Sequence, residues 1–119
     1  MISDLDVLKT FGALARHAAE SQRVSAENVA NAANPGYRAE AVESFETFMK
    51  RVEANPSLEM TKAEFRHLKT EGPSAPNGNN VSLEQELFIS AEASGQHELA
   101  MSAYSKTIGL IKAALGRQR

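Results

Sequence analysis

Residues 83–115, LEQELFISAEASGQHELAMSAYSKTIGLIKAAL, decide the fold. Apolar or small residues recur in this stretch three and four positions apart for about nine turns of helix. This first row consists of Leu87, Ser90, Ser94, His97, Met101, Tyr104, Ile108, Ile111 and Leu115. Such spacing forms a continuous seam, which requires a partner helix. A second row runs beside it and makes the seam wide enough for more than one neighbour; it consists of Ala100, Ala103, Thr107, Leu110 and Ala114.

The partner helix is predicted between Leu5 and about Asn31, where a similar row repeats. Its members are Leu8, Phe11, Ala15, Ala18, Gln22, Ser25 and Val29. Ser3 or Asp4 can cap the start of this helix, because either side chain accepts hydrogen bonds from free backbone N–H groups. The turn sequence Asn34-Pro35-Gly36-Tyr37 ends it, and Pro-Gly suits the centre of a type II turn.

The middle of the chain is predicted to be less regular. A row of four apolar residues favours a helix of about three turns that Asn55-Pro56 stops; the row is Val42, Phe45, Met49 and Val52. Residues 57–70 read as a short strand or a turn-rich piece, and residues 71–80 read as a linker. Ser82 and Gln85 then form a capping box at the start of the last helix. Acidic residues occupy the first half of that helix and basic residues, including Arg117 and Arg119, its end.

These elements predict an all-α fold in which two long terminal helices form a coiled-coil hairpin around an irregular, partly flexible middle region. The expected segments are an N-terminal helix in residues 1–34, the middle region and linker in residues 35–80, and a C-terminal helix in residues 81–119. A hairpin of two helices has one buried face, so the second row would stay exposed in a monomer. We therefore expect neighbouring subunits to complete the fold.

Composition narrows the classes of function. The net charge of −2 is spread along the chain, which argues against nucleic acid and against a basic membrane-binding helix. The absence of cysteine rules out a disulfide framework and a thiolate site. The acidic N-terminus and the lack of a long apolar run predict no cleaved signal and no membrane insertion. The location is then cytoplasmic, or outside the cytoplasm by a route without a cleaved signal.

No chemical motif predicts catalysis. The three histidines lack metal-ligand spacing, apart from the weak pair of His17 and Glu20, and His17 is expected to border the seam or face water. His97 is expected to be partly buried within the seam. Glycine-rich phosphate loops and nucleophile elbows are absent from the sequence. The sequence therefore predicts a non-enzymatic protein without catalytic residues, cofactor or metal.

A family resemblance begins at residues 28–38, NVANAANPGYR. They resemble the N-terminal signature of the bacterial flagellar rod and hook axial proteins, in which a repeated Asn-x-Ala-Asn pattern runs into Pro-Gly-Tyr. The matching signature residues are Asn28, Ala30, Asn31, Pro35, Gly36 and Tyr37. Most members have threonine where this chain has Asn34. The short length and residues 78–86, GNNVSLEQE, resemble the proximal rod subgroup, which has aspartate where this chain has Ser82.

The resemblance implies a structural subunit of the proximal rod of the flagellar basal body, which crosses the periplasm and transmits torque. Its implied partners are other rod subunits, FliE-like and FlgC-like, with the MS ring as a further neighbour. It also implies passage through the type III export apparatus without a cleaved signal, and self-assembly in the service of motility.

The resemblance assigns roles to particular residues. The assembly seam would comprise Leu8, Phe11, Leu87, Met101, Tyr104, Ile108, Ile111 and Leu115. Asn28 and Asn31 would hydrogen-bond across helices or to the turn. Phe45 and Met49 resemble the export-gate motif of rod and hook substrates, although ordinary helical spacing favours the seam of a local helix. The alternative function, from another class, is a small cytoplasmic adaptor or chaperone that binds one partner helix.

Overall fold

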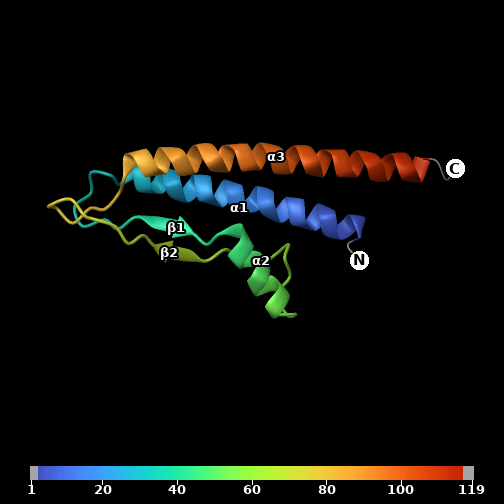
Figure 1. The fold of residues 1–119 in the computed structure, drawn as a ribbon, viewed down its shortest axis with the longest axis horizontal. Coiled ribbons are helices and arrows are strands. Elements are labelled where there is room, and N and C mark those ends of the chain that lie inside the picture. The colour runs from blue at the N-terminus through green and yellow to red at the C-terminus, as the bar shows by residue number, and fades with distance from the viewer. Residues whose placement is uncertain (1–2, 117–119) are drawn as a thin grey trace.

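The computed structural model describes residues 3–116, so Arg117 and Arg119 lie outside the described part of the chain. Two long helices, α1 (Asp4–Ala30) and α3 (Leu83–Gly116), lie side by side and run in opposite directions (Figure 1). Between them in sequence come β1 (Glu40–Val42), α2 (Phe45–Ala54) and β2 (His67–Lys69). The molecule measures 68 × 28 × 17 Å and is elongated. Residues 40–69, which contain β1, α2 and β2, form a small lobe beside the helix pair (Figure 1).

The ends of α1 follow from local chemistry. Ser3 is the N-cap, and it forms a capping box in which its side chain accepts from the Asp6 N–H and Asp6 accepts from the Ser3 N–H. These bonds lower the pKa of Asp6. After the helix, the Tyr37 N–H donates to the Asn34 carbonyl at 3.2 Å, and Gly36 has a φ of 77°. This geometry confirms the predicted type II turn.

Small residues form the contact between α1 and α3. The buried residues of α3 are Glu86, Ala93 and Ala100, which are spaced seven apart. Towards the other end of the pair, the ring of Tyr104 lies 3.7 Å from the position of a Cβ atom at Gly12. Because alanine and glycine occupy the contact, the helices approach closely while most large apolar side chains of α3 point elsewhere.

The middle region has more structure than the predicted all-α fold allows. Strands β1 and β2 pair antiparallel, with Ala41 opposite Leu68. Helix α2 begins at the N-cap Ser44 and carries the fully buried Phe48. Phe48 joins Ala13 of α1 and Ala63 in a cluster that is extended by the partly buried Phe45, Met49, Val52, Met60 and Phe65. Helix α2 confirms the short helix predicted before Asn55-Pro56. The expectation of an all-α fold whose middle is otherwise irregular was wrong, because the two strands pair and this segment packs its own aromatic core against α1.

A buried ion pair fastens this lobe. The guanidinium of Arg51 donates to both carboxylate oxygens of Glu43, and the Arg66 N–H donates to the same carboxylate at 2.8 Å. Arg51 holds the pKa of Glu43 below its ordinary value.

Each strand has only three residues, which is too short for an alternation of polar and apolar residues to reveal it.

Candidate assembly site

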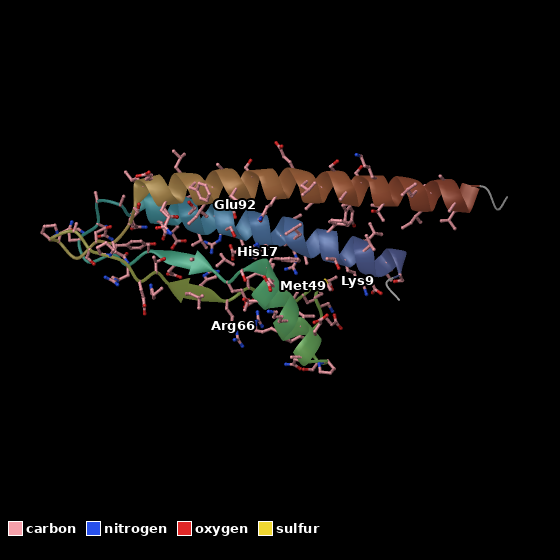
Figure 2. All side chains as sticks on the ribbon, in the orientation of Figure 1. Lys9, His17, Met49, Arg66 and Glu92 are labelled. Atoms are coloured by element: carbon pink, nitrogen blue, oxygen red, sulfur yellow. The ribbon has the colours of Figure 1, made fainter. Side chains whose placement is uncertain are left out.

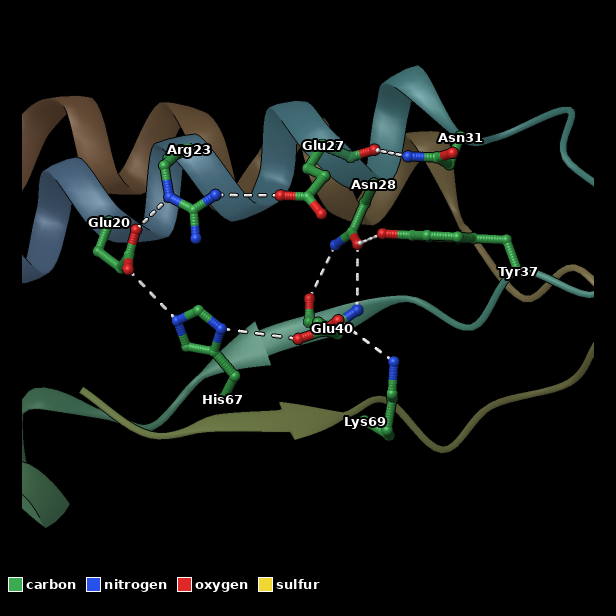
Figure 3. Close-up of polar contacts among 9 residues, drawn as sticks. All are labelled: Glu20, Arg23, Glu27, Asn28, Asn31, Tyr37, Glu40, His67 and Lys69. Atoms are coloured by element: carbon green, nitrogen blue, oxygen red, sulfur yellow. Dashed lines mark hydrogen bonds and ion pairs between the residues drawn. The ribbon is translucent and has the colours of Figure 1, made fainter. Parts of the chain in front are cut away.

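The signature residues form a hydrogen-bonded junction where α1 meets the first strand (Figure 3). Asn28 is fully buried, and its side-chain amide donates to the Glu40 carbonyl at 2.7 Å. Its Oδ1 accepts from the Glu40 N–H and from the Tyr37 hydroxyl, both at 3.0 Å. Desolvation, followed by the Glu27 carboxylate, raises the pKa of Tyr37. Asn28 thus fixes the path of the chain after the turn.

The second motif segment closes the same junction from the other side. The Asn79 side chain is buried and donates to the carbonyls of Asn31, the C-cap of α1, and of Asn34 in the turn that follows. Asn80 accepts from the Ala39 N–H at 2.6 Å and donates to the Thr70 carbonyl at 2.8 Å. Residues 28–38 and 78–86, far apart in sequence, therefore build one structural unit.

The other signature residues are more peripheral. Asn31 donates from its side chain to the Glu27 carbonyl within its own helix, at 2.9 Å. Ala30, Pro35 and Gly36 are exposed. Asn79 and Asn80 were read as the end of a polar linker, because their partners are backbone groups that the sequence does not place nearby.

A charged cluster that the sequence did not predict lies beside the junction (Figure 3). Arg23 pairs with Glu20 and Glu27, and it is the main cause of a lowered Glu20 pKa. His67 of β2 lies between two carboxylates, 3.3 Å from Glu20 and 3.6 Å from Glu40. These contacts join β2 to both α1 and β1.

The large apolar side chains of α3 are mostly exposed. Their exposed fractions are 58% for Leu83, 73% for Leu87, 68% for Phe88, 65% for Leu99, 48% for Met101, 72% for Leu110 and 61% for Leu115. Leu5 and Val29 of α1 are exposed as well. A groove of about 470 Å³ between the end of α1 and the start of α3 is lined by Val29, Leu83 and Leu87, among others. Apolar surface of this extent is typical of an interaction surface.

The predicted seam residues divide into two groups. Leu8, Phe11, Tyr104, Ile108 and Ile111 are partly buried, whereas Leu87, Met101 and Leu115 are exposed. The strip of α3 that touches α1 runs through Ala93 and Ala100, and Ala100 belongs to the second predicted row. The exposed members are consequently available for contacts outside the monomer.

Two other groups of predicted residues lie away from this surface. Phe45 and Met49 are partly buried on α2 and pack against Phe48, as the seam of a local helix would. His17 is buried on the face of α1 turned towards the lobe, with its ring edge-on to Phe45 and Phe65 (Figure 2). His17 therefore does not face water. His97 is partly buried on α3, as expected.

Neither the protein-family models nor the curated proteins with which the sequence was compared match it. Within residues 3–116, no helix is long and apolar enough to cross a membrane. In the same part of the chain, no three His, Asp or Glu side chains are grouped in a way that could hold a metal ion.

Proposed function

We propose that this chain is a structural subunit of the proximal rod of the bacterial flagellar basal body, similar to FlgB. It would assemble through its terminal helices, pack around a common axis as coiled coils, and transmit torque. Its neighbours would be FliE-like and FlgC-like subunits and the MS ring. It would reach the periplasm unfolded, through the type III export apparatus.

The junction between the two motif segments carries this proposal. Asn28 and Tyr37 belong to the segment that resembles the axial-protein signature, and Asn79 belongs to the segment that resembles the proximal rod subgroup. A chance likeness in two separate segments gives no reason for them to touch. Here they share one hydrogen-bonded unit, which joins the end of α1 to the segment that leads into α3.

The exposed surface of α3 adds a physical argument. Each large apolar side chain left in water forgoes about 1.5 to 3 kcal/mol of burial free energy. Leu99 and Leu110 are 11 residues apart and lie on the same side of a straight helix, whereas Leu87, 12 residues before Leu99, lies about 120° around it at 3.6 residues per turn. One neighbouring helix does not cover both sides, which fits a tube of helices better than a single partner.

The direct test is to locate the subunit. A strain that lacks the gene is complemented with a tagged chain, and purified basal bodies are imaged by electron microscopy. We expect density for the tag at the base of the rod and restored motility. Tagged protein that stays in the cytoplasm while motility is unaffected by the deletion would overturn the proposal.

A surface variant sharpens the same test. Leu110→Gln alters a side chain that is 72% exposed, so the free energy of unfolding of the isolated chain should change by no more than about 0.5 kcal/mol. The variant should nevertheless fail to restore motility. Lys62→Gln, which alters an exposed side chain of the lobe, is the matched control and should restore motility fully.

The adaptor or chaperone alternative draws on the same exposed leucines, because one long helix could cover part of them. The two functions differ in the behaviour of the free chain. A rod subunit is expected to be a monomer with frayed helix ends that gains helix on assembly, whereas an adaptor is expected to unfold cooperatively as a fully helical monomer or dimer. Circular dichroism combined with light scattering distinguishes them.

A further inference from the structure

Two mostly buried polar residues, Glu86 and His17, line the same groove. Glu86 is 5% exposed, yet within residues 3–116 its carboxylate forms no hydrogen bond or ion pair. His17 is 8% exposed, and its Nδ1 has no hydrogen-bond partner in that part of the chain, whereas its Nε2 contacts the Glu43 carbonyl at 2.6 Å. Buried polar atoms are almost always hydrogen-bonded, so the unpaired Nδ1 of His17 at this groove points to a ligand.

The groove has three walls and a volume of about 400 Å³. Helix α1 supplies His17 and Ser25, the segment from β1 to α2 supplies Val42 and Phe45, and α3 supplies the stretch from Gln85 to Gln96. That stretch is about 16 Å long at 1.5 Å per residue, which is enough to seat about three turns of another helix. Glu92 also lines the groove (Figure 2).

The lining specifies the chemistry of the occupant. It contains no lysine or arginine, while Glu86 and Glu92 of α3 both contribute, and Glu92 too forms no ion pair within the described residues. Two carboxylates on one wall attract a cation and repel an anion. Phe88, Ile89 and Val42 make the remainder of the lining apolar. The fitting ligand is therefore an amphipathic helix that carries a basic residue beside an apolar face.

This chain itself carries such a helix end. Helix α3 has 34 residues against 27 in α1, and its C-terminal end extends past the start of α1 (Figure 1). Ile108, Ile111 and Leu115 follow helical spacing along one face there, and Lys112 lies beside them, four positions after Ile108. Lys112 and Leu115 are exposed.

We propose that the C-terminal end of α3 from a second copy of this chain occupies the groove, with its Lys112 paired to Glu86 and Glu92. The C-terminal end of α3 and the groove lie towards opposite ends of the molecule, so the contact is heterologous and can repeat from one copy to the next. The inference rests on the proposed function in one respect, because a repeating head-to-tail contact suits a subunit of an axial structure.

The natural absence of cysteine allows a direct test by cross-linking. Purified full-length Glu92→Cys and Lys112→Cys chains are mixed up to their solubility limit under mild oxidation. A seated contact holds the two thiols at a high effective concentration, so the disulfide-linked dimer should form about tenfold faster than in a control mixture. The control pairs Lys112→Cys with Ser102→Cys, an exposed position of α3 outside the groove. Equal rates in the two mixtures would overturn the contact.

A charge exchange tests the pairing itself. Near the solubility limit, where the otherwise monomeric chain is expected to associate, Glu92→Lys and Lys112→Glu should each weaken self-association about fivefold to tenfold in sedimentation velocity, because each places like charges together. Mixing the two single variants should restore association, since the altered groove of one then matches the altered end of the other. Absence of restoration would reject the pairing, provided circular dichroism shows that both variants keep their helices.

The results separate this inference from the proposed function. If the tagged subunit is found at the base of the rod but the Glu92 and Lys112 thiols cross-link no faster than the control, the head-to-tail contact is wrong and the rod proposal stands. If the thiols cross-link rapidly but the subunit is absent from basal bodies, the head-to-tail contact stands and the rod proposal is wrong. Cross-linking of the Lys112 thiol to a different rod protein in isolated basal bodies, with none to a second copy, would also overturn the contact.

Discussion

A Cβ atom added to Gly78 would lie only 3.3 Å from the Cα atom of Gly36. The two glycines belong to different motif segments, and both have a positive φ, 77° at Gly36 and 86° at Gly78. The Gly36 N–H also donates to the Asn77 carbonyl at 2.9 Å. The two loops are therefore held backbone to backbone, at a distance that a side chain would disturb.

The change in the free energy of unfolding when each glycine is replaced by alanine should follow from this geometry. Gly36→Ala should cost about 1 to 2 kcal/mol, because the left-handed conformation is unfavourable for alanine. Gly78→Ala should cost more, since the added methyl group also presses on Gly36. Gly95→Ala, on an open side of α3, should instead stabilise the chain by up to about 1 kcal/mol. Urea denaturation measures all three, and a smaller effect at Gly78 than at Gly36 would contradict the geometry.

Removing the buried amide of Asn28 should destabilise the fold strongly. Asn28→Ala loses three hydrogen bonds and leaves the Glu40 backbone groups unsatisfied, at a cost of about 2 to 4 kcal/mol. Tyr37→Phe removes one of these bonds and should cost about 1 kcal/mol. Asn34→Ala is the matched control, because the exposed Asn34 side chain makes a single long contact of 3.4 Å to Asn31. Equal effects at Asn28 and Asn34 in urea denaturation would refute this role.

Local chemistry explains how much of this junction the sequence could predict. Capping residues and the Pro-Gly turn act on their immediate neighbours, so Ser3 and the turn at Gly36 were predicted from the sequence and are confirmed. The partners of Asn79 lie more than 40 residues away in the sequence, on Asn31 and Asn34. A polar side chain that bonds a distant carbonyl and one that faces water look the same in a sequence.

The ion pair between Glu43 and Arg51 should make stability depend on pH. Arg51 lowers the folded-state pKa of Glu43 below the ordinary value of 4.5. The resulting stabilisation is fully present above pH 4.5 and is lost as the pH falls through the lower folded-state value. Unfolding free energies measured by urea denaturation should therefore decrease below pH 4.5.

Glu43→Gln should remove this part of the pH dependence and cost about 2 to 4 kcal/mol at neutral pH, because Arg51 is left without its carboxylate. Glu46→Gln, which alters an exposed pair with Lys50, should keep the wild-type profile within about 0.5 kcal/mol. A Glu43→Gln profile that falls as steeply as the wild type would exclude Glu43 as its cause.

The export role of Phe45 and Met49 now has a matched control. Both side chains pack against Phe48, and so does Val52 on the same helix. If the pair is recognised by the export gate, Phe45→Ala and Met49→Ala should reduce secretion well beyond Val52→Ala at equal cellular levels. If the three variants secrete alike, the residues serve only the lobe core. The readout is the secreted fraction in culture medium from cells that lack the hook.

The lobe shows why packing is harder to predict than helices. The contact between the tilted rings of Phe48 and Phe65 joins residues 17 positions apart in the sequence, with ring centroids 4.6 Å apart. Strands of three residues give no periodic signal, so β1 and the pairing of the two strands were missed, although β2 lies within residues 57–70, where a short strand or a turn-rich piece was predicted. On α3 the spacing correctly predicted a long helix and placed Ala100 in the second row. It did not reveal that Ala93 and Ala100, rather than the leucines, would be the buried apolar residues of the helix.

The tie that Asn79 makes to the end of α1 has a consequence for how the molecule opens. One end of the helix pair is closed by hydrogen bonds from a second segment, whereas at the other end α3 extends alone. Amide hydrogen exchange should accordingly slow steadily from the extended end towards the closed one, because opening propagates from the end with fewer restraints. The helix pair therefore unfolds from the end where α3 extends alone towards the end that Asn79 holds.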